Sequence, residues 1–132
     1  MNTNPFEVQV RFSDIDLLGH VNNVAYFNYF EMARIHYFHP LLGKDWDWMK
    51  QGVVLVKNEA TYLSSIRLHD KPKITLYVTN IGTKSFSLGY EVNVGPQLCA
   101  TGSSTLVCFN NYSKQTIEIP EAMRLALNAL QK

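Results

Sequence analysis

Hydrophobic and polar residues alternate along several segments of the chain, in the period-2 pattern typical of strands with one buried face. The first such segment is 6–12, where Phe, Val, Val and Phe alternate with Glu, Gln and Arg. Four more strand-like segments follow later in the chain, at 53–63, 73–81, 85–94 and 98–109. The connections Gly82-Thr83-Lys84 and Gly95-Pro96-Gln97 are short and rich in turn-forming residues, which predicts antiparallel hairpins.

The pattern changes between the first two strand-like segments, where residues 24–38 are mostly aromatic or aliphatic. Polar residues recur there at every third position: Asn28, Glu31 and Arg34. This spacing predicts a long helix with one narrow polar stripe and otherwise buried faces. We expect Pro40 and Gly43 to end this helix. A second, short helix is predicted from Pro120 to Leu127, because proline and an acid are common at helix starts.

Small residues lie in the middle of the last strand-like segment: Ala100, Gly102, Ser103 and Ser104. Such residues suit a strand that a helix approaches closely, so we expect the long helix to pack there. The chain then reads as one strand, one long helix and four antiparallel strands, which is an α+β arrangement. We expect one domain over residues 1–132, with the helix wrapped by a five-stranded antiparallel sheet.

Composition narrows the class of protein. With 132 residues there is room for one domain, and 46% hydrophobic residues exclude a disordered chain. The net charge is +1 and no run of like charges occurs, so a nucleic-acid-binding surface is not indicated. The longest purely aliphatic run, 53–56, is far too short to span a bilayer. The start of the chain lacks a signal-peptide pattern, and we expect a cytoplasmic protein without a membrane partner.

The two cysteines and the low charge content each lead to a further expectation. Cys99 and Cys108 are nine residues apart, so on an uninterrupted strand they would point to opposite faces; we expect two buried free thiols.

Only 17% of the residues are charged, and apolar residues occupy both faces of the segment that begins at Val53. We therefore expect a second subunit to cover part of this surface, in a homodimer or homotetramer.

The segment most suggestive of chemistry runs from Ser13 to Tyr26, between the first strand and the long helix. It contains two acids, an imidazole and two amides: Asp14, Asp16, His20, Asn22 and Asn23. A helix N-terminus presents free backbone N–H groups, which suit a developing oxyanion, and a nearby acid can attack or activate water. Asp and Asn are also ordinary helix caps, so the pattern by itself has low specificity.

The same segment resembles a known family. The run Asp-x-Asp-Leu-Leu-Gly-His-Val-Asn-Asn-Val-x-Tyr at 14–26, followed by Tyr-Phe-Glu-x-Ala-Arg at 29–34, is similar to the hot-dog-fold thioesterases of the 4-hydroxybenzoyl-CoA thioesterase type. It is also similar to the His-Val-Asn-Asn segment of fatty acyl-CoA and acyl-carrier-protein thioesterases. Arg67-Leu68-His69-Asp70 fits the turn after the second strand of that family. The resemblance covers most of the chain and implies the hot-dog fold.

The resemblance also implies roles for individual residues. The acid that acts as nucleophile or general base falls on Asp16, and the backbone N–H that polarises the thioester carbonyl falls near Asn23. His20 occupies the position of the catalytic histidine of the acyl-carrier-protein thioesterases. Those enzymes have asparagine two residues earlier, where this chain has Leu18, and members of the hydroxybenzoyl type lack a histidine at position 20. His20 therefore has two possible roles: a structural one, or a catalytic or substrate-positioning one.

Four further residues are candidates for substrate contacts, each with an alternative. Asn22 is assigned first to helix capping, and Tyr26 to the core or an interface rather than to an acyl pocket. Glu59 is a candidate acid contributed across a subunit interface, and Lys84 a candidate for the phosphates of a nucleotide-bearing carrier; solvated side chains are the alternative for both. Glu31 and Arg34 are spaced to pair on the helix.

These observations predict an acyl-CoA thioesterase that needs no metal or redox cofactor, with an acyl-carrier protein as the other carrier to consider. Two rival functions stay open: a hot-dog hydratase or dehydratase acting on acyl thioesters, and a non-catalytic acyl-thioester-binding protein. Serine-hydrolase and metal-site motifs are absent from the sequence.

Overall fold

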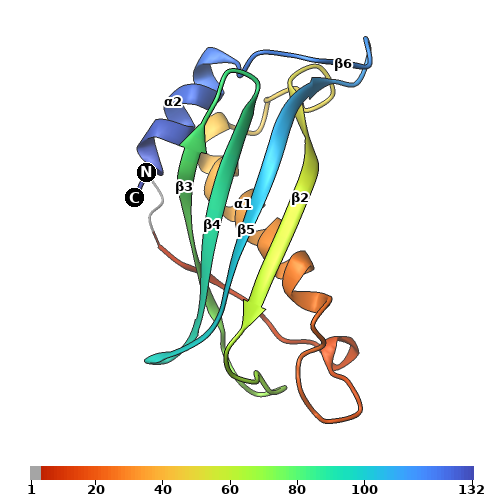
Figure 1. Ribbon diagram of the computed structural model, residues 1–132, viewed down its shortest axis with the longest axis vertical. Coiled ribbons are helices and arrows are strands. Elements are labelled where there is room, and N and C mark those ends of the chain that lie inside the picture. The colour runs from red at the N-terminus through yellow and green to blue at the C-terminus, as the bar shows by residue number, and fades with distance from the viewer. Residues whose placement is uncertain (1–3) are drawn as a thin grey trace.

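The structure is a computed structural model that describes residues 4–132, so the first three residues of the predicted domain lie outside the described part. Its elements are, in chain order, β1 (Phe6–Glu7), the 3-10 helix η1 (Phe12–Asp14), α1 (Ala25–Leu42), β2 (Gly52–Tyr62), β3 (Lys73–Ile81), β4 (Ser85–Val94), β5 (Gln97–Asn110), β6 (Gln115–Thr116) and α2 (Glu121–Ala129). The strands form one antiparallel sheet in the order β1-β3-β4-β5-β2, and β6 pairs with β5. Figure 1 shows α1 running along the sheet. The α+β prediction is confirmed.

The long helix α1 packs on the sheet at Gly102 of β5, a residue without a side chain. A Cβ atom added at Gly102 would lie 2.5 Å from the ring of Phe30, so α1 can approach β5 this closely only because residue 102 is glycine. The Phe30 ring stacks on Tyr90 of β4 at 4.2 Å between centroids, with the planes 6° apart. Phe30, Tyr90 and Ala33 are fully buried. The predicted contact between the helix and the small residues of β5 is confirmed.

Both predicted hairpins are present, and β3 and β4 have the predicted bounds. Alternation along β4 buries Phe86, Leu88, Tyr90 and Val92 against the helices. Both cysteines are buried and free, as expected, although they lie nine residues apart. The reason is a register shift: Val92 pairs with Ala100 and Asn93 with Leu98, so Cys99 is an extra residue in β5. This bulge changes the alternation between the two cysteines.

Three details of the sequence prediction were wrong. Only Phe6 and Glu7 of the predicted first strand pair with β3; Val8 and Val10 are buried, but Phe12 is 83% exposed and begins η1. The alternation of apolar and polar residues at 6–12 therefore reflects which side chains are buried, and it does not show that all of these residues pair in the sheet. Pro40 lies inside α1, which continues to Leu42 and ends at Gly43 with a φ of 85°. Because a proline has no N–H, one helical hydrogen bond is missing at Pro40, and the helix ends two residues later. The sheet also has a sixth strand, β6.

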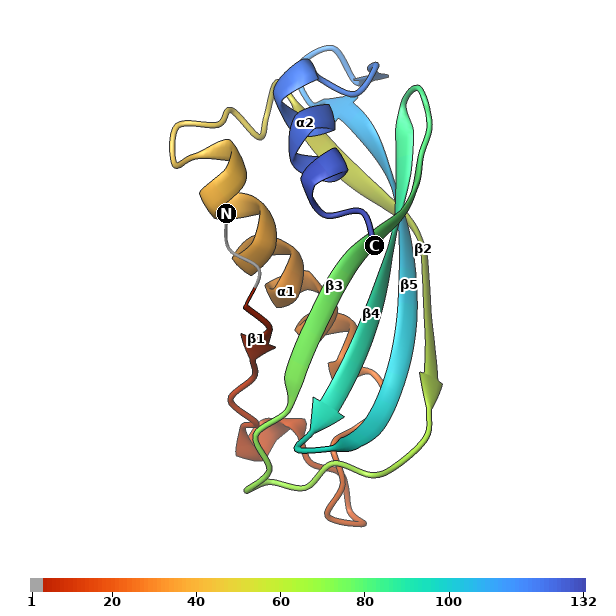
Figure 2. The ribbon, with the colours of Figure 1, turned by 90° about the vertical axis from the view of Figure 1, so that its left-hand side faces the viewer.

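Helices cover one face of the sheet. Figure 2 shows α1 and α2 on the same side of the strands, with no helix or strand of residues 4–132 on the other side. At the β2 edge, Val54, Leu55 and Val56 are 36%, 44% and 58% exposed. The chain therefore leaves apolar surface uncovered along the last strand of the sheet, and its coverage by a second subunit stays a prediction.

Candidate functional site

The loop between η1 and α1 is held as a compact turn by its own backbone. The N–H of Asp16 donates to the carbonyl of His20 at 2.9 Å, and the N–H of Asn22 donates to the carbonyl of Asp14 at 2.7 Å. Val21 donates to the carbonyl of Ile66 at 2.7 Å, which ties the loop to the segment after β2. Gly19 has a φ of 80°, a conformation that side chains rarely adopt. The candidate residues thus sit on a fixed framework at the start of α1.

Asp16 is exposed, and its carboxylate is oriented by two backbone donors. Its Oδ1 accepts hydrogen bonds from the N–H of Leu18 at 2.9 Å and of His20 at 3.2 Å. Its Oδ2 accepts no hydrogen bond from any residue between 4 and 132. One oxygen therefore positions the carboxylate, and the other is available to react or to bind a water proton.

Asp14, two residues earlier, is buried and has a different role. Its Oδ2 accepts hydrogen bonds from the Tyr29 hydroxyl at 2.8 Å and the Arg11 N–H at 3.0 Å, and the Arg11 guanidinium lies 3.4 Å from Oδ1. Burial opposes ionisation, but these hydrogen bonds and the Arg11 charge hold the pKa of Asp14 below its ordinary value. Burial and the bond to Asp14 raise the pKa of Tyr29. The first acid of the motif thus connects the loop to α1.

His20 is partly exposed and lies against the segment that follows β2. Its Nδ1 is 3.4 Å from the hydroxyl of Ser65, the long end of the hydrogen-bond range. Its main chain, through both N–H and carbonyl, is what holds Asp16 in place. The imidazole therefore shares one loop with Asp16, and the geometry is compatible with both a structural and a catalytic role.

Asn22 and Asn23 lie just before the first residue of α1. The Asn22 side chain accepts from the N–H of Val24 at 2.9 Å and so closes the turn that leads into the helix; the N-cap residue itself is Val24, so Asn22 precedes the cap. The carbonyl of Asn23 accepts the Tyr62 hydroxyl at 2.8 Å. The N–H of Asn23 has no acceptor in the described part of the chain, residues 4–132. This free donor lies at the positive end of an 18-residue helix.

Tyr26 is buried, with 2% of its surface exposed. Its ring meets Tyr62 edge-on at 4.9 Å, and burial raises the pKa of Tyr26 to about 12. The hydroxyl is therefore neutral at physiological pH. This placement agrees with the core assignment and brings Tyr26 close to the residue that binds the Asn23 carbonyl.

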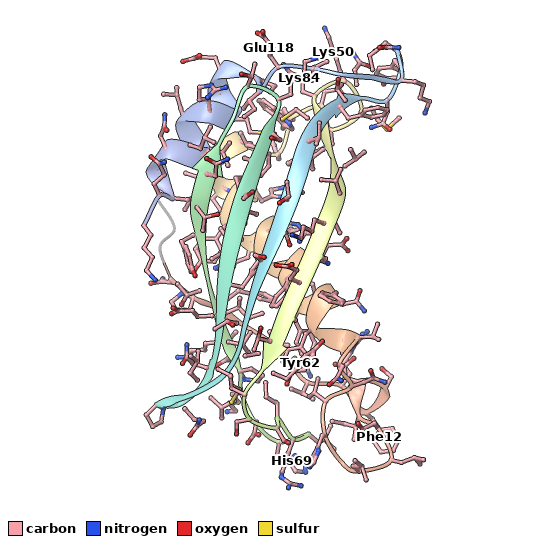
Figure 3. The ribbon with its side chains drawn as sticks, viewed as in Figure 1. Phe12, Lys50, Tyr62, His69, Lys84 and Glu118 are labelled. Carbon is pink, nitrogen blue, oxygen red and sulfur yellow. The ribbon has the colours of Figure 1, made fainter. Side chains whose placement is uncertain are left out.

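Two candidates lie apart from the loop within one chain. Glu59 is exposed on the face of β2 that points away from α1, where Lys57 approaches at 3.2 Å and Ser103 donates at 3.1 Å. The Lys57 and Ser103 contacts lower the pKa of Glu59. Lys84 donates to Thr116 at 3.3 Å, at the end of the sheet opposite Phe12 and His69 (Figure 3). A single chain does not bring either side chain to Asp16.

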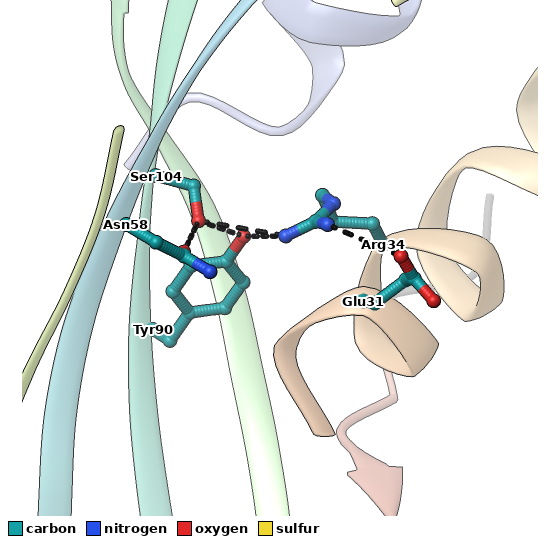
Figure 4. Close-up of polar contacts among 5 residues, drawn as sticks. All are labelled: Glu31, Arg34, Asn58, Tyr90 and Ser104. Carbon is teal, nitrogen blue, oxygen red and sulfur yellow. Dashed lines mark hydrogen bonds and ion pairs between the residues drawn. The ribbon is translucent and has the colours of Figure 1, made fainter. Parts of the chain in front are cut away.

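One polar cluster was not predicted from the sequence. The pairing of Glu31 with Arg34 is present, but loose, at 4.0 Å. Arg34 instead reaches the sheet, where it donates to Tyr90 at 2.9 Å (Figure 4). The sequence did contain one indication of this contact: Arg34 is the single Lys or Arg residue in a helix whose faces are mostly apolar.

No metal or membrane site emerges from the described residues. Among residues 4–132, no group of three or more His, Cys, Asp or Glu side chains is placed to hold a metal ion. None of the helices in that range is both long and apolar enough to cross a bilayer.

Comparison with known proteins bears on the family of this chain. Residues 10–127 match the model of the Thioesterase-like superfamily. The chain belongs to this family. Protein YsmA of Bacillus subtilis is 31% identical over 114 residues, which cover 84% of this chain and 76% of that protein. The family match over residues 10–127 confirms the resemblance to thioesterases drawn from the sequence.

Solved structures have the same fold. A Thermus thermophilus thioesterase complexed with coenzyme A and Zn is 32% identical, with a TM-score of 0.83, over 99% of this chain and 97% of that one. The PA5185 protein of Pseudomonas aeruginosa is 27% identical, with a TM-score of 0.88, over 96% of this chain and 90% of that one. This member of the superfamily therefore has the hot-dog fold that the sequence predicted.

Proposed function

We propose that this protein hydrolyses acyl-CoA thioesters to a free acid and a thiol. One observation carries the proposal: the exposed Asp16 carboxylate, with one free oxygen, shares a loop with the free N–H of Asn23 at the start of α1. An acid and an oxyanion donor are the two groups that thioester cleavage needs. Family membership and the coenzyme A complex of the Thermus relative support the same substrate class.

In the proposed mechanism, the thioester carbonyl oxygen accepts a hydrogen bond from the Asn23 N–H. The positive end of α1 favours the negative charge that develops there. Asp16 then acts in one of two ways. As a nucleophile it attacks the carbonyl carbon, the thiolate leaves, and water hydrolyses the resulting anhydride; as a general base it takes a proton from the attacking water. Oδ2 is the oxygen free for either role.

His20 places an imidazole in the same loop as the acid. The main chain of His20 bonds Asp16, so the imidazole lies close to the acid. We propose that the imidazole positions the substrate or donates a proton to the leaving thiolate. Substitution of His20 by Ala at constant Asp16 geometry is expected to lower turnover less than substitution of Asp16.

We further propose a homodimer or homotetramer in the cytoplasm. Strand β2 is 11 residues long and its outer edge is unpaired within residues 4–132, beside the exposed residues Val54, Leu55 and Val56. An unprotected apolar edge of this length favours association. In such an assembly, we propose Glu59 of a neighbouring subunit as a second acid at the site, and Lys84 as a contact for the phosphates of the carrier.

The test is thiol release from a panel of short, long, branched and aromatic acyl-CoAs, with the native protein and Asp16→Asn side by side. We expect turnover of at least one substrate and its collapse in the variant, with the oligomer unchanged by size-exclusion chromatography. Acyl-CoA binding without thiol release from any panel member would refute hydrolysis and favour a non-catalytic binding protein. Carrier-protein thioesters and enoyl-CoA hydration are the next assays in that case.

A further inference from the structure

A groove of about 500 Å³ lies between the C-terminal half of α1 and the sheet, away from the Asp16 loop. We call it the α1 groove. Its apolar walls come from α1, the loop before β2, and strands β2, β4 and β5: Ile35, Phe38, Trp48, Leu55, Phe86 and Leu106. A volume of this size suits a small organic ligand, and the walls favour an alkyl or aryl body. No motif in the sequence indicates this groove.

Arg34 lines this groove at the boundary between helix and sheet, and Glu31 and His39 of the same helix line it too. The side chain of Arg34 is 13% exposed. Its Nη1 donates to the hydroxyls of Tyr90 at 2.9 Å and Ser104 at 3.4 Å, and Ser104 donates in turn to Asn58 at 2.6 Å (Figure 4). The polar groups of β2, β4 and β5 thus fix the position of one end of the guanidinium.

The other end of the guanidinium forms only a loose ion pair, with Glu31. A guanidinium has five N–H donors, and those on Nε and Nη2 meet no acceptor among residues 4–132 within hydrogen-bond distance. The nearest carboxylate, that of Glu31, is 4.0 Å from Nη2, and its side chain is 67% exposed. Because the Arg34 side chain is 13% exposed and Glu31 is held only loosely, the Nε and Nη2 donors are accessible to a ligand. The groove therefore combines apolar walls with an accessible guanidinium edge that is only loosely paired.

We propose that the α1 groove binds a carboxylic acid with an apolar body, such as a medium-chain fatty acid. The carboxylate accepts the two parallel hydrogen bonds that the Nε and Nη2 edge of Arg34 offers, a geometry that favours carboxylates. The hydrocarbon lies among Phe38, Phe86 and Leu106. Charge complementarity favours this ligand over a neutral chain, and binding is a property separate from thioester hydrolysis, although hydrolysis would release such an acid.

Binding is measured with decanoate below its micelle concentration, by calorimetry and by the emission of Trp48, which lines the groove. We expect saturable binding to the native protein. Methyl decanoate has the same body without the charge, and we expect it to bind about tenfold more weakly or worse, because a charge-assisted bond is lost. Equal affinity for acid and ester would overturn the proposal.

Variants locate the site. Arg34→Gln should weaken decanoate binding about tenfold, and Arg34→Lys should weaken it too, because lysine lacks the planar fork. Glu31→Gln is the matched control: Glu31 is exposed, so the fold is retained, and removal of the competing carboxylate should tighten binding. Unchanged affinity in Glu31→Gln and in the Arg34 variants would refute the site. Absence of decanoate binding while the protein is oligomeric would also refute it, and would assign the groove to a contact between copies of the chain.

Discussion

The two ends of α1 are built in opposite ways. At its N-terminal end, a polar loop is held by backbone hydrogen bonds and presents the Asp16 carboxylate and the Asn23 N–H to solvent. At its C-terminal end, apolar side chains surround a groove whose lining includes the mostly buried cation of Arg34. Backbone geometry thus positions the candidate reactive groups, whereas side-chain packing shapes the candidate ligand site. Each end should respond to different substitutions.

The largest effect is expected at the N-terminal end. Asp16→Asn should lower thioester turnover by about 10²-fold or more, because the amide is neither a nucleophile nor a base. Decanoate binding at the α1 groove should stay within about twofold, since the groove lies along the other half of the helix. Thiol release and calorimetry on the same samples check this. A parallel loss of both would show that the two ends form one site.

The next effect concerns the contact between Phe30 of α1 and Gly102 of β5, which holds the helix on the sheet. Gly102→Val should destabilise the fold by about 3 kcal/mol, the upper end of the range for overpacking, because the new side chain meets the Phe30 ring. Urea unfolding monitored by circular dichroism measures it. Thr101→Val, which lies on the face of β5 away from the helix, is the control and should change stability by less than about 0.5 kcal/mol. Similar losses in both variants would mean that α1 does not press on residue 102.

A smaller effect is expected from the buried acid of the loop. Asp14→Asn should cost about 1–2 kcal/mol, since asparagine keeps one acceptor oxygen but loses the charge that Arg11 and Tyr29 face. The lowered pKa of Asp14 adds stability that is present above its ordinary value of 3.8 and is lost as pH falls below it. The variant should therefore lose less stability than the native protein on acidification. Thermal unfolding between pH 3 and pH 7 measures the two curves, and parallel curves would contradict this.

The smallest effect is expected from Lys84. Lys84→Ala should leave the unfolding free energy within about 0.5 kcal/mol, because its hydrogen bond to Thr116 is an exposed one. KM for acyl-CoA distinguishes its two roles. A rise of severalfold that disappears at high salt supports a phosphate contact across a subunit interface, and an unchanged KM assigns Lys84 to solvated surface.

Sequence patterns predicted the fold well where one physical rule acts alone. Alternation placed β3 and β4 at their observed bounds, and the small residues of β5 located the helix contact. They failed where two rules compete. Val8 and Val10 alternate because they are buried, yet they lie outside the ladder with β3, and only the N–H of Val8 still donates to the carbonyl of Pro72. Pro40 lies inside the helix, which continues to Leu42.

The candidate site divides in the same way. Asp16, His20, Asn22 and Asn23 lie close in sequence, so one local motif contains all four. The hydroxyl partners of Arg34 are 56 and 70 positions away, on two different strands, and no local pattern contains that information. Glu59 and Lys84 show the converse: residue type suggested a role, and only the topology of the sheet separates them from the loop within one chain.

The extra residue at Cys99 has a consequence for how this fold tolerates insertions and deletions. The two strands of the β4–β5 hairpin differ in length by that one residue. The bulge therefore decides which side of the sheet each later side chain of β5 points to. Loss of a residue near the hairpin tip would remove the bulge and leave the helix-facing positions of β5 in place. Loss of a residue beyond Gly102 would instead turn the remainder of the strand over. Length variation among homologues should therefore concentrate at the tip of this hairpin.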